Sequence, residues 1–388
     1  MKEADPAPEY LPYSRPYVTE DDIAAVAEVL RSPMISQGER LVAFEEAFAG
    51  VANARYATAF SSGTAALHGM AFAAGLGPGD EVILPPLTFA GTANAVLSTG
   101  ATPVFADIDP VTFCLDPQAA RRAVTPRTRA ILTVDFAGRP SAYDDLAAVA
   151  ADADALLLSD AAHAPGGRYR GRAIGSDLAA MTAFSFNPVK NLTAGEGGMV
   201  TTDDAAFRDR LVMLRAHGMT RDAAQLERTS PGGWYYEQQH LGFNYKLSEL
   251  HAALGRSQLA RLGVFNTHRR ALACLYTHAL ADLPLDLPTA PEDGASTWHL
   301  YVVQVQPPYR RAALFAFLRE RGFGVQVHYI PVPCHPYYQR LGYTMDACPY
   351  AARYYERALS LPLHPAMSGA DARRVVTALQ AFFKGGSR

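Results

Sequence analysis

One stretch of the sequence, Met181-Thr-Ala-Phe-Ser-Phe-Asn-Pro-Val-Lys190-Asn-Leu-Thr-Ala-Gly-Glu-Gly-Gly-Met199, places a lysine soon after an apolar run that is typical of a buried strand. A glycine-rich turn and a second strand-like run, Met199-Val-Thr-Thr202, follow that lysine. Among apolar neighbours Lys190 would lose solvation, which lowers the pKa of its amine and makes it a usable nucleophile. The stretch therefore predicts a lysine suited to Schiff-base chemistry, with an exposed loop lysine as the open alternative.

Outward from this stretch, short β-rich runs alternate with alanine-rich amphipathic segments over the first two thirds of the chain. The predicted strands cover residues 55–60, 81–84, 102–106, 130–135, 155–159, 181–184 and 199–202, and predicted helices cover 64–74 and 143–150. This alternation is typical of a sheet covered by helices on both faces. The sequence predicts an α/β fold.

The pattern changes near Gly242. A long helix is predicted over residues 247–262, and beyond it strand-like runs at 298–305 and 324–328 alternate with helical segments at 311–321 and 370–383. We therefore predict a large domain of residues 1–265 and a smaller C-terminal α+β domain of residues 266–388. The polar, turn-rich residues 220–233 are expected to be mobile.

Length and composition are typical of a soluble globular protein, with 388 residues, 49% hydrophobic and 19% charged. The formal net charge is -3 with both signs interspersed, which argues against a nucleic-acid partner. The start of the chain lacks the apolar core of a signal peptide, and no apolar run approaches the ~20 residues of a membrane span. We expect a cytoplasmic protein without a membrane partner. The four cysteines lack zinc-type spacing, so neither a disulfide nor a metal site is expected.

The segment Ser61-Ser-Gly-Thr-Ala-Ala66 follows one predicted strand and opens a predicted helix. Backbone amides and the Thr64 hydroxyl would converge at the N-terminus of that helix, where unpaired N–H groups and the helix dipole attract a phosphate. The same residues would also serve as an ordinary N-cap. A Walker loop is excluded because no Gly-Lys-Ser/Thr follows.

Asp160 ends the apolar run Ala155-Leu-Leu-Leu-Ser159 and is followed by Ala161-Ala-His163. A carboxylate at the carboxyl end of a sheet strand lies where α/β proteins bind ligands, and it needs a cationic partner there. Capping a helix, or binding a metal together with His163, are the alternatives, although an Asp-His pair alone has too few ligands.

The three features match the three handles of pyridoxal 5'-phosphate. Its phosphate suits the helix N-terminus, its ring nitrogen must stay protonated beside an acid, and its aldehyde reacts with an amine. The sequence therefore predicts this cofactor.

The chain also resembles the sugar aminotransferases of the StrS/DegT family, which have the aspartate aminotransferase fold. The resemblance covers essentially the whole chain and is carried by Ile35-Ser-Gln-Gly38, residues 61–67, Pro86-Leu-Thr-Phe89, Ser159-Asp-Ala-Ala-His163, residues 184–198, Gly242-Phe-Asn-Tyr-Lys-Leu-Ser-Glu249 and Gln326-Val-His-Tyr329. The stretch Gly324-Val-Gln-Val-His-Tyr-Ile-Pro331 and His163 are most similar to the pseudaminic-acid pathway transaminases. Asn187 and the run Lys190-Asn-Leu-Thr depart from that branch.

The resemblance implies fold type I of the pyridoxal phosphate enzymes, with a mainly parallel seven-stranded sheet. It implies that Lys190 bonds the cofactor and moves the proton, and that Asp160 pairs with the ring nitrogen. Phe89 would stack on the ring, although core packing is the alternative for this residue, and His163 would lie near the phenolic oxygen. Gly63, Thr64 and Ser185 would bind the phosphate.

The same resemblance implies a homodimer with shared active sites, in which Asn244 reaches the phosphate of the partner. A structural asparagine that caps the following helix is the alternative. His328 and Tyr329 would line the substrate side, and His328 is equally consistent with a structural histidine. Trp298, His299 and Tyr301 are expected near the same cleft.

The implied reaction moves an amino group from glutamate to a keto sugar nucleotide, specifically a 4-keto-6-deoxy hexose. The alternatives are amination of a cyclitol or another ketone in antibiotic assembly, and a non-catalytic regulatory protein that binds the cofactor. Lys190 argues against the last of these.

Overall fold

The computed structural model describes residues 10–36, 38–291 and 296–385. Gln37 of the Ile35–Gly38 motif, the extreme N-terminus and residues 292–295 of the C-terminal part lie outside the described residues.

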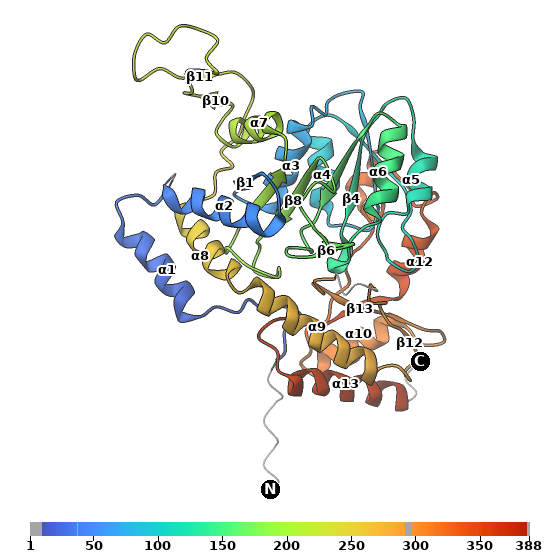
Figure 1. Cartoon of the computed structure of the whole chain (residues 1–388). Coiled ribbons are helices and arrows are strands. Elements are labelled where there is room, and N and C mark those ends of the chain that lie inside the picture. The colour runs from blue at the N-terminus through green and yellow to red at the C-terminus, as the bar shows by residue number, and fades with distance from the viewer. Residues whose placement is uncertain (1–9, 37, 292–295, 386–388) are drawn as a thin grey trace.

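A seven-stranded sheet forms the centre of the larger part (Figure 1), in the order β1 (Tyr56–Phe60), β9 (Gly198–Thr202), β8 (Met181–Ser185), β5 (Leu156–Asp160), β4 (Thr128–Val134), β2 (Glu81–Leu84) and β3 (Thr102–Phe105). Strands β8, β5, β4, β2 and β3 pair in parallel, whereas β9 pairs antiparallel with both β8 and β1. The predicted α/β fold with a mainly parallel seven-stranded sheet is confirmed.

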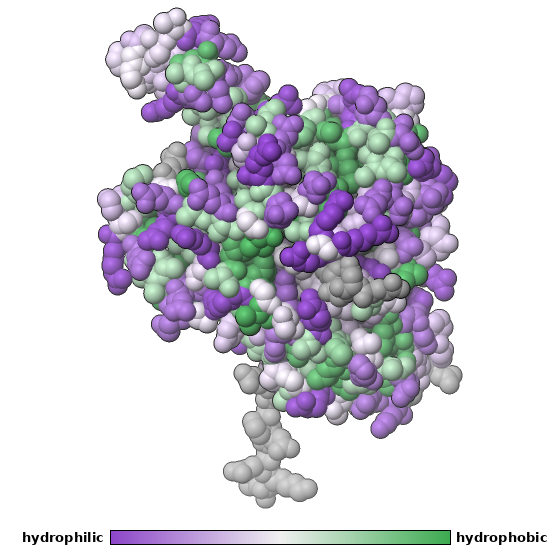
Figure 2. Space-filling view, viewed as in Figure 1, coloured by the Kyte–Doolittle hydropathy of each residue, from purple (hydrophilic) through white to green (hydrophobic). Residues whose placement is uncertain are grey.

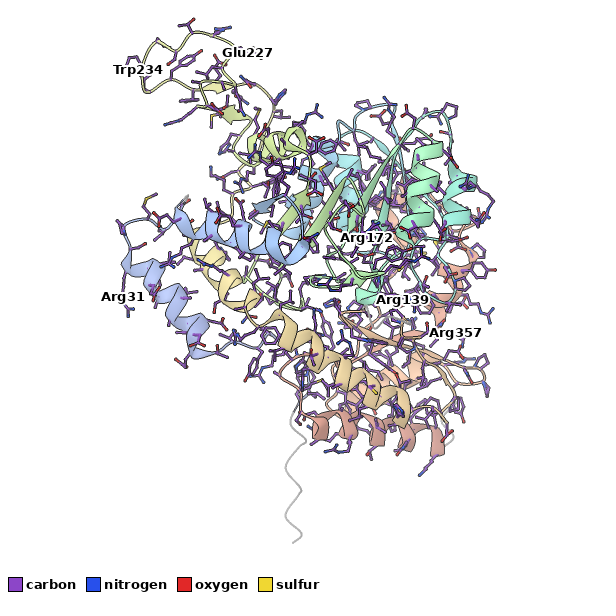
Figure 3. The ribbon with its side chains drawn as sticks, viewed as in Figure 1. Arg31, Arg139, Arg172, Glu227, Trp234 and Arg357 are labelled. Atoms are coloured by element: carbon purple, nitrogen blue, oxygen red, sulfur yellow. The ribbon has the colours of Figure 1, made fainter. Side chains whose placement is uncertain are left out.

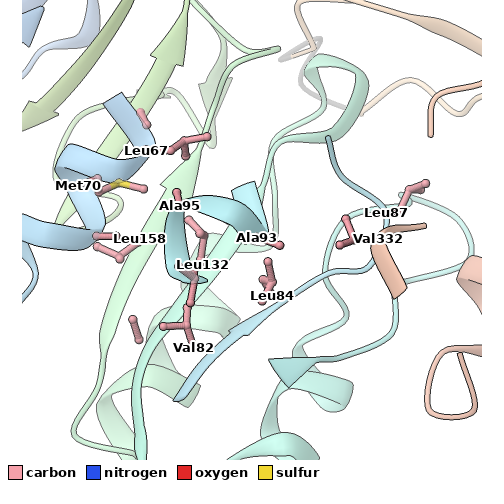
Figure 4. Packing of buried hydrophobic residues seen from close by; sticks show 14 of the residues in the cluster. Leu67, Met70, Val82, Leu84, Leu87, Ala93, Ala95, Leu132, Leu158 and Val332 are labelled. Carbon is pink, nitrogen blue, oxygen red and sulfur yellow. The ribbon is translucent and has the colours of Figure 1, made fainter. Parts of the chain in front are cut away.

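The sheet is buried on both faces, which explains why its strands are continuous apolar runs. Successive residues of one strand face two different cores, since Leu132 and Leu158 belong to one cluster and Ile131 and Leu157 to the other. Figure 4 shows Leu132 and Leu158 among the side chains of the first cluster, with Leu158 beside Met70. The period of two along each strand therefore divides its side chains between the two helical layers.

Two sets of helices supply the opposite layers. The first cluster is covered by α3 (Gly63–Ala73), α4 (Ala90–Ser98) and α7 (Ala205–Arg215). The second is covered by α2 (Glu39–Ala52), α5 (Pro117–Ala123), α6 (Tyr143–Asp152) and α8 (Glu249–Leu259). The N-terminal helix α1 (Glu20–Arg31) packs against α8.

The C-terminal part is built on an antiparallel sheet of β12 (Leu285–Asp286), β13 (Tyr301–Val305) and β14 (Ala358–Leu361). Its helices are α9 (Leu262–Ala279), α10 (Arg311–Glu320), α11 (Pro336–Arg340), α12 (Pro349–Arg357) and α13 (Gly369–Lys384). A third apolar cluster fills this part. The predicted domain boundary at residue 265 falls inside α9 and stays a prediction.

Three expectations for this region are wrong in detail. The helix predicted over residues 247–262 is two helices that break at Arg261, whose guanidinium bonds Asp22 and the Thr19 hydroxyl beside α1. Residues 324–328 form no strand, since only Gln326 pairs there, through an isolated bridge to Ser360. Strand β13 begins three residues later than predicted because Trp298 has a left-handed φ of 50°.

A hairpin of β10 (Met219–Thr220) and β11 (Glu237–Gln238) projects from the body beside α7 (Figure 1). It stands clear of the rest of the molecule in the space-filling view (Figure 2), and Glu227 and Trp234 lie in its outer loop (Figure 3). The polar residues 220–233 belong to this hairpin. None of the described helices is long and apolar enough to cross a membrane.

Candidate active site

A cavity of about 270 Å³ opens at the carboxyl ends of the central strands. The last residues of β4, β5 and β8, which are Val134, Asp160 and Ser185, all line it. Its other lining residues are Tyr13, Ser62, Gly63, Thr64, Leu67, Thr88, Phe89, Thr92, Ala162, His163, Asn187, Val189, Lys190, Glu196, His299, His328 and Tyr329. The cavity lies where open α/β sheets bind ligands.

Lys190 lies in the turn that follows β8, and its backbone N–H donates to the Asn187 carbonyl at 2.9 Å. The side chain is partly buried and lines the cavity, so it is not an exposed loop lysine. Burial lowers the pKa of its amine to about 8, while the nearby Asp160 carboxylate acts in the opposite direction. Roughly a tenth of the amine is therefore neutral at pH 7, far more than for a lysine with an ordinary pKa, and the neutral form is the nucleophile.

Asp160 is buried, and its two oxygens have different partners. Thr92 donates its hydroxyl to Oδ2 at 2.7 Å, and the backbone N–H of Ala162 donates to Oδ1 at 3.1 Å. Burial raises the pKa of Asp160, although both hydrogen bonds and the Lys190 amine act against that rise. Residues 161–167 form turns, so Asp160 does not cap a helix. A charged carboxylate in this position is stabilised by a cation in the cavity.

The N-terminus of α3 meets the end of β8. Ser62 caps the helix by accepting the Ala65 N–H at 3.1 Å, which leaves the first N–H groups of α3 free for a ligand. A Cβ placed on Gly63 would lie 2.7 Å from the Ser185 Cβ, so only glycine allows this approach. The Thr64 side chain is exposed. These residues fit a phosphate group.

His163 and Phe89 line the same cavity from different parts of the fold: His163 follows β5, and Phe89 precedes α4. The Ala137 N–H donates to His163 Nδ1 at 3.3 Å, and His163 Nε2 lies 3.0 Å from the Tyr329 hydroxyl. Burial lowers the pKa of His163 far below its usual range, so the ring is neutral and its Nε2–H donates to Tyr329. Phe89 is 60% exposed and begins α4, which excludes simple core packing for its ring.

Other predicted residues are placed differently. His328 lines the cavity and also bonds the Ser360 hydroxyl through Nδ1 at 2.8 Å, so its structural and site roles coexist. Trp298 and Tyr301 were expected near the cleft, but both are buried in the C-terminal core. Of that group only His299 lines the cavity.

Asn244 does not line the cavity of its own chain. It is exposed and pairs through an isolated bridge with Ala216. The N-cap of α8 is Ser248, whose hydroxyl accepts the His251 N–H, so the alternative that Asn244 caps that helix is wrong.

Several lining residues were missed by the sequence interpretation. Thr92 holds the Asp160 carboxylate, and Asn187 donates its side-chain N–H to Glu196 at 2.9 Å on the rim. Tyr13 comes from the N-terminal segment, whose Ser14 hydroxyl donates to the Val189 carbonyl at 2.9 Å. A signal existed for Glu196, which lies in the glycine-rich turn after Lys190. Nothing in the sequence places Tyr13 in the site.

The model of the DegT/DnrJ/EryC1/StrS aminotransferase family matches residues 16–380. The chain is 44% identical over 382 residues to the spore coat polysaccharide biosynthesis protein SpsC of Bacillus subtilis strain 168, covering 97% of this chain and 98% of that protein.

Solved structures of aminotransferases are also similar to this chain. The Helicobacter pylori aminotransferase PseC, involved in the biosynthesis of pseudoaminic acid, superposes with a TM-score of 0.90 at 29% identity, covering 97% of this chain and 100% of that chain. The PMP-form of the Streptococcus pneumoniae sugar aminotransferase Spr1654, described as putative, gives 0.91 at 29% identity over 97% and 99% of the two chains. Its PLP-form gives 0.90 at 28% identity over 97% and 99%.

Proposed function

This chain belongs to the DegT/DnrJ/EryC1/StrS aminotransferase family, and from that premise we propose that it transfers the amino group of glutamate to a keto sugar nucleotide. It is a pyridoxal phosphate-dependent sugar aminotransferase. The acceptor that we propose is a 4-keto-6-deoxy hexose carried on a nucleoside diphosphate. A similar solved protein, PseC, is described as an aminotransferase of pseudoaminic acid biosynthesis, which supports a sugar of this class.

One observation carries the proposal: an amine of lowered pKa, a buried carboxylate and a helix N-terminus all open into one cavity. When bound, pyridoxal phosphate supplies an aldehyde that bonds an amine and a protonated ring that accepts electrons. The three features of the cavity fit its aldehyde, its ring nitrogen and its phosphate. The site therefore has the groups that amino transfer requires.

In this proposal Lys190 is the covalent attachment point and the proton carrier. Its Nζ would take a proton from the carbon that bears the donated nitrogen. It would then give a proton to the carbon on the other side of that nitrogen, which belongs to the cofactor. Asp160 would hold the proton on the ring nitrogen of the bound cofactor, and pairing with that cation would offset the burial of the carboxylate. The Asp160 carboxylate and the protonated ring nitrogen would thus each stabilise the charge of the other.

The remaining residues orient the reacting groups. Phe89 would cover one face of the ring with its exposed side chain, and His163, whose Nε2–H donates to Tyr329, would lie near the phenolic oxygen. Gly63, Thr64 and Ser185 hold the phosphate at the start of α3. His328 and Tyr329 line the side of the cavity that receives the sugar.

Incubation with glutamate labelled with heavy nitrogen and a panel of keto sugar nucleotides tests this function. We expect mass spectrometry to show the label in an aminated 4-keto-6-deoxy sugar nucleotide. A free cyclitol ketone belongs in the same panel as the alternative acceptor. Labelling of the cyclitol alone, with no sugar nucleotide labelled, would contradict the proposed acceptor.

We further propose a homodimer in which Asn244 completes the phosphate site of the partner. Asn244 is exposed and pairs through the isolated bridge with Ala216, whose hydrogen bonds are made by the flanking residues Phe243 and Tyr245. The neighbouring hairpin and the segment after it expose apolar and aromatic groups, with Trp234 in the hairpin at 73% and Leu241 beyond it at 73% exposure. No arginine is among the described residues that line the cavity.

Subunit mixing tests the shared site. Lys190→Ala protein and Asn244→Ala protein each lose activity, but a heterodimer with crossed sites has one site that carries both defects and one that carries neither. Activity should therefore rise on mixing, toward about half of the wild-type rate per heterodimer, because half of the sites are intact. Tagged subunits show by affinity capture that heterodimers have formed. If those heterodimers are no more active than the Asn244→Ala parent, Asn244 does not act across the interface.

A further inference from the structure

Asn191, the residue after Lys190, is buried between the two parts of the molecule and uses every polar atom of its side chain. Its Nδ2 donates to Asn266 Oδ1 at 2.9 Å and to the Thr297 carbonyl at 3.1 Å, and its Oδ1 lies 2.9 Å from His299 Nδ1. Both amide protons are therefore engaged, so the oxygen is left to accept. The side chain joins the lysine-bearing turn to α9 and to the segment before β13.

His299 has to be the donor in its bond with Asn191. Burial lowers the pKa of His299 well below its usual range, so the ring is neutral and carries one proton. Because Asn191 Oδ1 can only accept, that proton lies on Nδ1. The ring also stacks on His163, with centroids 4.3 Å apart and planes inclined by 28°.

The backbone around His299 is held from both sides. Thr297 donates its N–H to the Gly138 carbonyl at 3.0 Å and its hydroxyl to the His163 carbonyl at 2.7 Å. Arg269 is fully buried and donates to the His299 carbonyl at 3.2 Å. The backbone of His299 is therefore held in place, so a hydrogen bond from its ring can hold Asn191 in place as well.

From these contacts we propose that His299 is a positioning residue for Lys190 and acts through Asn191. The bond from Nδ1–H to Asn191 Oδ1 fixes the backbone beside Lys190, so that the amine stays inside the cavity next to Asp160. Removing the donor leaves a buried carbonyl oxygen unsatisfied and frees the turn that carries the lysine. The inference rests on the proposed role of Lys190, since a misplaced amine transfers protons poorly.

Two substitutions separate this role from packing. His299→Asn keeps an N–H donor near the position of Nδ1 but removes the ring stack, whereas His299→Leu keeps bulk and removes the donor. We expect His299→Leu to slow the half-reaction with glutamate about 10- to 100-fold, with the KM for glutamate changed less than about twofold. His299→Asn should stay within about threefold of the wild type.

A second readout needs neither donor nor sugar. The sequence contains four lysines, Lys2, Lys190, Lys246 and Lys384, so acetylation of each amine is followed separately by mass spectrometry in cofactor-free protein. The pH dependence of the Lys190 rate should give a pKa of about 8 in the wild type. It should be unchanged in His299→Asn and move toward the ordinary ~10.4 in His299→Leu, because the freed amine gains water.

The outcomes separate this inference from the proposed function. A wild type that shows no half-reaction with glutamate contradicts the donor, while the acetylation result still decides the role of His299. Equal behaviour of the Leu and Asn variants, in either readout, overturns the inference. Should His299→Leu fail to fold, Asn191→Ala removes the same bond, together with the two bonds that Asn191 donates to Asn266 and Thr297, and has to raise the Lys190 pKa in the same way.

Discussion

Lys190→Ala protein should carry no covalently held cofactor, and treatment with borohydride should leave no reduced cofactor on any of its peptides. In the wild type the same treatment should fix the cofactor on the Lys190 peptide, because an amine of pKa about 8 bonds an aldehyde readily near neutral pH. Turnover should fall by more than the ~10⁴-fold that loss of a general acid–base group alone can cost, since the substitution removes both the attachment point and the proton carrier.

Because the sequence contains only four lysines, the peptide that carries the reduced cofactor is easily identified. Lys384 is exposed in the last turn of α13, far along the chain from the cavity, and provides the matched control. Lys384→Ala protein should trap the cofactor and turn over at the wild-type rate. A label found on the Lys246 peptide, or trapping that survives in Lys190→Ala, would show that the wrong lysine has been identified.

The fold could be predicted from the sequence because its signals are local. Runs such as residues 81–84 and 156–160 are buried on both faces, so their apolar character is continuous and easily seen. The break at Arg261 was missed because its cause is distant: the residue bonds Asp22, far away in the sequence. The run at 324–328 has the composition of a strand, but the N-terminal segment takes its pairing positions, with Leu11 bonded to both Gly322 and Gly324. Tertiary contacts overrode local propensity in both places.

The residues of the site also fall into two groups, those with a local sequence signal and those placed by tertiary packing. Asp160 and Lys190 could be predicted because one ends a buried strand and the other follows one, and the carboxyl ends of parallel strands meet at one edge of the sheet. Thr92 and Tyr13 could not, since each reaches the cavity from an element with no motif of its own, whereas His299 was expected near the cleft only through the resemblance. Thr92 faces Asp160 across 68 residues of sequence, through the packing of α4 on the sheet. Placing such residues requires knowledge of the packing.

Asp160→Asn is the substitution with the second largest expected effect, and the structure indicates that the protein will tolerate it. The new oxygen can still accept the Ala162 N–H, and the new N–H₂ can donate to the Thr92 hydroxyl. Thr92 can then donate to Thr88, whose hydroxyl lies 2.7 Å away and is able to accept. The shape and the hydrogen bonds survive, and only the negative charge is lost.

That charge is what holds the proton on the cofactor's ring nitrogen, so its loss removes the electron-accepting property of the ring. We expect turnover to fall about 10³-fold with the melting temperature nearly unchanged, in line with the loss of one buried electrostatic partner of a reacting group. Thr92→Val is the matched control, because it keeps the charge and removes only the hydrogen bonds of the Thr92 hydroxyl to Asp160 and Thr88. The Thr92 bond lowers the pKa of Asp160, so removing it raises that pKa and should shift the acidic limb of the pH profile upward. This limb reports the ionisation of Asp160 and should therefore vanish in Asp160→Asn. Near-normal turnover in Asp160→Asn, or an acidic limb that persists unchanged in it, would mean that another group keeps the ring protonated.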